Sequence, residues 1–172
     1  MTGRSLAGLI AAAFALTLAA APGPPADEPA SPPPSESEAR QRARLLHGLI
    51  HDTLQVVHGR YFREGERLAI PAAVLGDVFR EAEERDGVRL RWLVVDGQAM
   101  NIDHEPQDAF ETAAAEALRA GARGHEAVED GAYRFAGPIT LKAECLKCHL
   151  PSRSSNEART AGLLISIPIG KP

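Results

Sequence analysis

Both cysteines of the chain stand in one short segment, ECLKCH, at residues 144–149. Cys145, Cys148 and His149 form a C-x-x-C-H motif, which is the attachment signature of a c-type haem. On a helix, residues three and four apart lie on one face, so the two thiols and the imidazole can reach the same group. The motif therefore predicts thioether bonds from Cys145 and Cys148 and an axial iron ligand from His149.

Three other uses of the cysteine pair stay open at this point. A structural zinc site needs four ligands, yet the sequence has no second cysteine pair and no histidine pair at finger spacing. A thioredoxin-like dithiol usually sits early in a βαβ pattern, whereas this motif comes late in the sequence. The third use is a plain structural disulfide. Haem attachment is favoured over all three.

Haem attachment of this kind takes place outside the bacterial cytoplasm, so export is expected. Residues 1–4 form a short basic segment, and residues 6–21 are apolar and rich in alanine. Small residues at 19–21 are typical of a cleavage site, which predicts a signal peptide over residues 1–21 and a periplasmic protein. Pro22 suits the position after a cut poorly, so a retained N-terminal segment stays open as the one route to a membrane.

Residues 22–38 are rich in Pro, Ala, Ser and acidic side chains and predict a disordered spacer. Residues 39–172 have the length of one ordinary domain, the predicted haem c-binding domain. The formal charge of −4 argues against nucleic acid as a partner.

Hydrophobic periodicity and turn residues predict an α+β fold, with helices first and antiparallel strands later. Helices are expected over residues 39–62, 71–85 and 106–120. A charged loop is expected over residues 63–68, and strands are expected over 88–95, 98–102, 132–136, 139–141 and 161–169.

The residue on the other face of the iron determines reduction potential and reactivity. His47, His51 and His58 form one stripe on the first predicted helix, because they are spaced by four and seven residues. The stripe either faces the haem or is a half-exposed helix face. His58 has the most apolar neighbours and is the preferred sixth ligand, followed by His51.

Two further candidates lie after the first predicted strand. Met100 belongs to a residue type common as an axial ligand in electron carriers. His104 lies in a turn before a helix and is equally suited to a capping role. His125 has a glycine neighbour and charged residues nearby, which predicts a solvated loop position.

The chain resembles the single-haem c, PAS-like domain family, also called the Tll-like haem-binding domain. The resemblance covers roughly residues 45–169. The motifs that carry it, in order, are RWLVV (91–95), Met100-Asn101, Pro106 with the helix from Asp108, GAYRFAGPI (131–139), ECLKCH (144–149) and GLLIS (162–166).

This resemblance implies a PAS-like antiparallel sheet with flanking helices around one covalent haem c. Cys145, Cys148 and His149 carry over as thioether sites and axial ligand. Members of the family can use a cysteine in the N-terminal helical region as the opposite ligand, but this sequence has no third cysteine. The histidine stripe is therefore the leading substitute.

The function expected from these observations is electron transfer with a redox protein partner, without enzyme activity. The alternative is a redox or gas sensor that signals through a partner, such as a membrane signalling protein. The sensor interpretation rests on fold analogy. A peroxidase would need an open iron face and a distal acid–base group, and no residue of the sequence stands out for that role.

Overall fold

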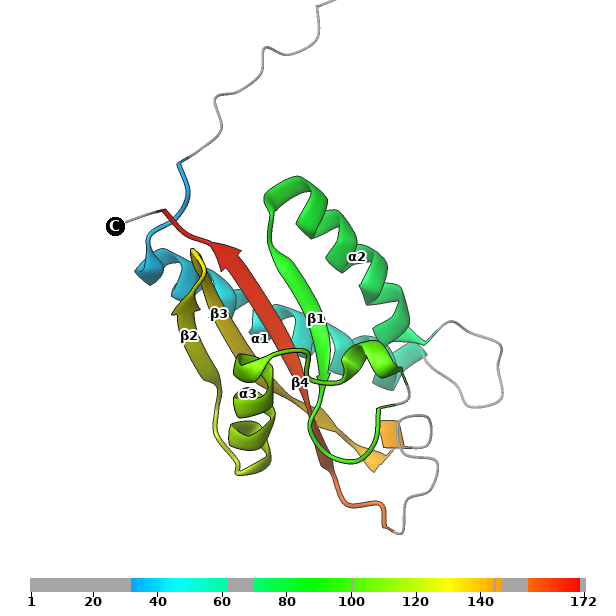
Figure 1. Ribbon diagram of the computed structural model, residues 1–172. Coiled ribbons are helices and arrows are strands. Elements are labelled where there is room, and N and C mark those ends of the chain that lie inside the picture. Colours follow the sequence, from blue (N-terminus) through cyan, green and yellow to red (C-terminus); the bar gives the residue numbers. More distant parts are fainter. Residues whose placement is uncertain (1–31, 62–69, 100, 144, 147–154, 171–172) are drawn as a thin grey trace, which may run out of the picture. The chain divides into compact units, whose positions relative to one another are not determined.

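The computed structural model describes residues 32–61, 70–99, 101–143, 145–146 and 155–170 (Figure 1). The chain divides into two units, Met1–Ser31 and Pro32–Pro172, and the first of them lies outside the described residues. The predictions that lie outside these ranges concern residues 1–21, most of 22–38, the loop 63–68, Met100, Cys148 and His149.

A four-stranded antiparallel sheet is the centre of the described part of the chain (Figure 1). Its strands are β1 (Arg89–Val94), β2 (His125–Glu129), β3 (Ala132–Leu141) and β4 (Arg159–Pro168), in the order β1-β4-β3-β2. Asp130 and Gly131 join β2 to β3 with φ of 52° and 74°, as a two-residue type I′ hairpin turn requires. The α+β class and the antiparallel sheet predicted from the sequence are confirmed.

Local signals explain where the two long helices begin and end. Helix α1 (Glu36–Tyr61) starts with a capping box: the Ser35 backbone N–H donates to the Glu38 carboxylate (2.8 Å), and the Glu38 N–H donates to Ser35 Oγ (3.4 Å). Helix α2 (Pro71–Asp86) begins at a proline. Proline suits this position because a backbone N–H in the first turn of a helix has no partner within the helix, so its absence costs no hydrogen bond. Gly87, at a φ of 66°, closes α2 in the left-handed conformation. None of the helices within the described ranges is long and apolar enough to cross a membrane.

The strand predicted over residues 98–102 is wrong. Asn101 Oδ1 accepts a hydrogen bond from the Asp103 N–H (3.0 Å) and starts a short 3₁₀ helix, η1 (Ile102–His104). The helix predicted from residue 106 begins instead at Ala109, because Asp108 caps α3 (Ala109–Arg119) by accepting from the Glu111 N–H (2.8 Å).

Three further expectations differ from the structure. The two short strands predicted over 132–136 and 139–141 are one continuous strand, β3. The strand β2 occupies residues where a charged loop was expected. Helix α1 begins at Glu36, so the last three residues of the predicted spacer are helical.

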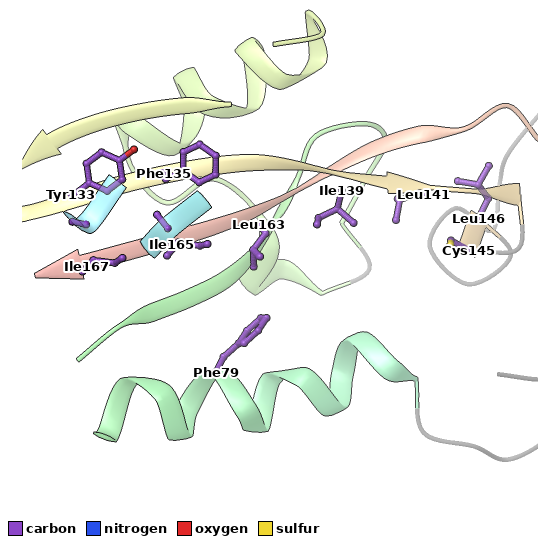
Figure 2. Close-up of a cluster of buried hydrophobic side chains, with 12 residues drawn as sticks. Phe79, Tyr133, Phe135, Ile139, Leu141, Cys145, Leu146, Leu163, Ile165 and Ile167 are labelled. Atoms are coloured by element: carbon purple, nitrogen blue, oxygen red, sulfur yellow. The ribbon is translucent and has the colours of Figure 1, made fainter. Parts of the chain in front are cut away.

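The sheet carries helices on both faces, with α1 and α2 on one and α3 on the other (Figure 1). Alternate residues of β3 and β4 point into the core beneath α1 and α2, as strand geometry dictates. Figure 2 shows that this core continues along β3, from Tyr133 near one end to Leu141, Cys145 and Leu146 at the other. The cysteine motif therefore starts where the hydrophobic core ends.

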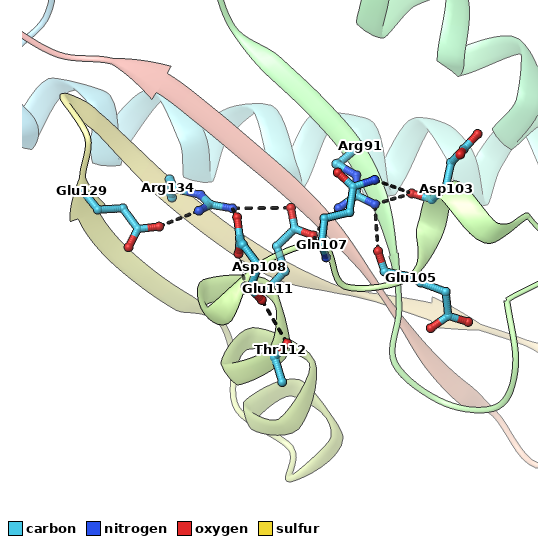
Figure 3. Close-up of polar contacts among 9 residues, drawn as sticks. All are labelled: Arg91, Asp103, Glu105, Gln107, Asp108, Glu111, Thr112, Glu129 and Arg134. Carbon is cyan, nitrogen blue, oxygen red and sulfur yellow. Dashed lines mark hydrogen bonds and ion pairs between the residues drawn. The ribbon is translucent and has the colours of Figure 1, made fainter.

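On the α3 face, the buried Glu111 joins three elements (Figure 3). Its side chain is 6% exposed and accepts from Arg91 of β1, from Arg134 of β3 (3.4 Å) and from the Gln107 N–H (2.8 Å). A buried carboxylate of this kind is stabilised only while its cationic partners stay in place.

Replacing Glu111 by alanine is expected to lower the free energy of unfolding by about 3 kcal/mol, because Arg91 and Arg134 would lose their shared counter-charge. Urea denaturation followed by circular dichroism measures this change. Glu116, exposed on the same helix, provides the control, and Glu116→Ala is expected to change stability by no more than about 0.5 kcal/mol. Equal losses for the two variants would contradict the structural role of Glu111.

Candidate functional site

A cavity of about 480 Å³ lies where α1, the start of α2, the end of β1 and the beginning of the cysteine motif meet. Its lining is mainly apolar, and Asp96 is the one carboxylate among the described lining residues. The residues on which the following argument depends are His58, Ala72, Gly76, Trp92, His104 and Cys145.

Cys145 lies in a helical turn that follows directly on β3. Its backbone N–H and that of Leu146 donate to the Lys142 carbonyl, at 2.9 and 3.2 Å. Leu146 is fully buried and anchors this turn in the core, while Cys145 is 8% exposed and lines the cavity. The helical conformation predicted for the motif thus holds at Cys145, and the positions of Cys148 and His149 lie outside the described residues.

The three histidines of the α1 stripe lie in two different environments. His58 lines the cavity together with Leu54 and Gln55. His47 instead packs edge-on against Phe135 (5.7 Å between ring centroids), and its Nε2 lies 3.1 Å from the Pro138 carbonyl oxygen. His51 stacks on His47 (6.1 Å) and has its Nδ1 3.0 Å from Asp52. Neither His47 nor His51 belongs to the described lining of the cavity.

The free edge of β3 explains why His47 lies there. Strand β2 pairs with β3 only as far as Ala136. Pro138, which has no N–H to donate, lies beyond this point, where β3 has no neighbouring strand on the β2 side. Side chains of α1 take the place of the missing strand. His47 is hydrogen-bonded to the Pro138 carbonyl, and the Gln55 amide donates to the Thr140 carbonyl (2.9 Å). Burial lowers the pKa of His47, and the hydrogen bond to Pro138 opposes this shift.

Gly137 makes the close approach of α1 possible. A Cβ at this position would collide with the His47 ring. The glycine therefore lets α1 lie flat on β3 at this point, which places the C-terminal part of α1 beside the cavity.

His104, the last residue of η1, also lines this cavity. The η1 turn that carries it is held by Arg91, which donates to the carbonyls of Asp103 and Glu105, the second at 3.0 Å (Figure 3). Burial lowers the pKa of His104, and the nearby Arg91 charge lowers it further. A neutral imidazole is the form that can ligate a metal.

The other sequence candidates are placed as follows. Met100 lies outside the described residues, although Ala99 and Asn101 on either side of it line the cavity. His125 is the first residue of β2, with its ring 5.2 Å from that of Phe110, so the prediction of a solvated loop position was wrong.

Sequence reasoning missed the α2 wall of the cavity. Trp92 of β1 lines the cavity and donates from Nε1 to the Ala72 carbonyl of α2 (3.0 Å). Ala72 and Gly76 are one turn apart and leave the space open, since a Cβ at Gly76 would meet no atom within 4 Å. The signal was available as a run of small residues on one face of the second predicted helix.

Within the described ranges, no three His, Cys, Asp or Glu side chains come together as a metal-ion site. The cavity instead combines an apolar wall, two imidazoles and a thiol. This is the donor set that a large, flat, metal-containing cofactor needs, with the protein supplying axial nitrogen and a covalent anchor.

Comparison with known proteins agrees with this picture. No match was found among curated proteins. Among solved structures, the chain is similar to that of the cyanobacterial heme-protein Tll0287, with a TM-score of 0.55 and 15% sequence identity over 77% of this chain and 98% of that one. At this identity, the similarity shows the fold. Residues 33–163 match the Tll0287-like family, and the chain therefore belongs to that family.

Proposed function

We propose that this protein is an exported monohaem c-type cytochrome that transfers electrons to or from a protein partner. Cys145 and Cys148 would form the thioether bonds, and His149 and His58 would be the axial ligands. The observation that carries the proposal is that Cys145 and His58, far apart in the sequence, line one cavity. Tll0287, the similar solved structure, is a haem protein, which supports haem as the cofactor.

The described residues fit a haem. A volume of about 480 Å³ lies within the roughly 300–1,000 Å³ typical of cofactor and ligand sites. When bound, haem supplies a one-electron iron centre whose potential depends on its axial ligands and the polarity around it. Leu54, Trp92 and Leu141 would exclude water from the porphyrin faces.

The protein would hold its own ligand side chains in place before the cofactor binds. Gln55, three residues before His58, is bonded to Thr140 of β3 (2.9 Å), which fixes the rotation of α1 near the cavity. Rigid placement of axial ligands keeps the geometry around a redox centre similar in both oxidation states, which favours outer-sphere electron exchange. No enzyme activity is part of the proposal.

A second candidate function is redox or gas sensing through a partner protein. The observation in its favour is His104, a second imidazole in the same cavity. If His58 were displaced by a small ligand, His104 would be available to donate a hydrogen bond to it. The partner in that case would be a signalling protein, such as one in the membrane.

An absorption spectrum of the reduced protein with and without CO separates the two functions. Two strong imidazole ligands leave no open iron position, so the electron-transfer proposal expects a low-spin spectrum that CO does not change. Rapid formation of a CO complex would favour the sensor. Protein from the periplasmic fraction that carries no covalent haem would contradict both.

A further inference from the structure

The outer face of α1 carries large apolar side chains that the described core does not use. Leu45, Leu49 and Val56 are 72%, 62% and 52% exposed. They fall within about 40° of one another around the helix. The inner face of the same helix is already packed against the sheet through Ala39, Ala43, Leu46, Ile50 and Leu54. An exposed apolar row of this kind is a candidate interaction surface.

The spacing of this row is that of a coiled coil. Arg42, Leu45, Leu49, Asp52 and Val56 follow one another at intervals of three, four, three and four residues, and all five are exposed. This is the alternation of a and d positions in a heptad repeat. We call these five residues the α1 seam.

The charges in the α1 seam identify the partner. In an antiparallel pair of α1 helices, a and d positions face one another. With the pair centred at residue 47, Leu45 faces Leu49 of the second copy and Arg42 faces its Asp52. A parallel pair would instead stack Arg42 on Arg42 and Asp52 on Asp52. The stretch of the seam from Arg42 to Asp52 is therefore self-complementary in one orientation only, as a two-fold symmetric contact requires, and Val56 lies beyond this stretch, opposite Glu38 of the second copy.

We propose that two copies of this protein associate through antiparallel α1 helices. Two central Leu45–Leu49 layers supply the apolar contact. One Arg42–Asp52 pair lies on each side of these layers, and the two pairs set the register. Asp52 now lies against His51 (3.0 Å) and is otherwise open to solvent, so it is accessible to the second copy. The proposal is independent of the cofactor, because none of the five residues lines the cavity.

Sedimentation equilibrium of the full chain tests the proposal. The unaltered protein is expected to be dimeric, and Leu49→Glu is expected to make it monomeric with an unchanged circular dichroism spectrum. Ile102→Glu is the control, since Ile102 is 81% exposed and lies outside α1. A monomer at all concentrations overturns the proposal. If that monomer binds phospholipid vesicles and Leu49→Glu does not, the seam faces lipid.

A charge-swap experiment tests the orientation. Arg42→Glu and Asp52→Lys each place like charges opposite one another twice, and each is expected to raise the dimer dissociation constant about tenfold or more. The double variant restores opposite charges and is expected to return the dissociation constant close to its original value. Losses that simply add in the double variant would overturn the antiparallel arrangement.

Discussion

The Cys145→Ala/Cys148→Ala double variant is expected to contain no covalently bound haem. Each thiol supplies one thioether bond in a C-x-x-C-H motif, so each single variant should keep at most one bond and the double variant none. Intact-mass measurement after denaturation, together with haem staining of a denaturing gel, reads the number of bonds directly. The unaltered chain should show a mass increase of one haem.

The structure allows attachment to be separated from folding. Cys145 is buried and touches the core, so its truncation alone costs about 1 kcal/mol, the typical effect of one substitution. Gln98→Ala is a suitable control, because Gln98 lines the cavity and carries no expected bond to haem. A double variant that still stains for haem would contradict attachment, and a zinc content or a disulfide in the unaltered protein would favour the alternatives.

Two helix ends were predictable from the sequence because they depend on local chemistry: Pro71 opens α2 and Gly87 closes it. The start of α1 was missed, because the capping box of Ser35 and Glu38 lies in the segment assigned to the spacer. The same local logic failed at Asn101, whose side chain bonds the Asp103 N–H and replaces the expected strand with a 3₁₀ turn. Short polar side chains favour turns even within an apparently alternating segment.

The strand errors have a different origin. Two strands were expected with a break between residues 136 and 139, yet β3 continues through Gly137 and Pro138 because β4 pairs with it along its whole length. Proline is tolerated there because β2 has already ended. Strand β2 alternates half-buried and exposed residues at the edge of the sheet, and its sequence HEAVE is too polar to be read as a strand without its partner.

The cysteine motif was visible in the sequence, but the position of the histidines relative to the cavity was not. His47 and His58 are eleven residues apart, so they share a helix face but lie roughly 16 Å apart along the axis. Periodicity reports the face and not which part of the sheet lies beneath it. His47 meets β3 at Gly137, whereas His58 lies beside the cavity. The same missing information concealed the place of His104 in the lining.

Replacing His58 by alanine is expected to convert a low-spin iron to a high-spin one and to make the reduced protein bind CO rapidly, because one axial position becomes open. Electron paramagnetic resonance of the oxidised protein and the CO difference spectrum measure the two effects. Free imidazole is expected to restore the low-spin signal in the His58→Ala protein, since truncation leaves space in the cavity that His58 lines.

Other histidines provide matched controls. His51→Ala is expected to leave the spin state unchanged, because His51 contacts His47 and Asp52 and is not in the described lining. His47→Ala is expected to lower stability, because it removes the contact with Phe135 and the bond to Pro138, while the spin state stays the same.

The decisive comparison is with His104→Ala. His104 reaches the cavity from a turn that Arg91 holds through two backbone carbonyls, so its backbone is anchored beside the cavity as that of His58 is. If His104→Ala opens the iron and His58→Ala does not, the ligand comes from η1. If neither variant does so, the ligand lies outside the described residues, with Met100 the next candidate because both of its neighbours line the cavity. Each result assigns the ligand to a different element, and only a ligand from α1 would connect the iron directly to the helix that carries the α1 seam.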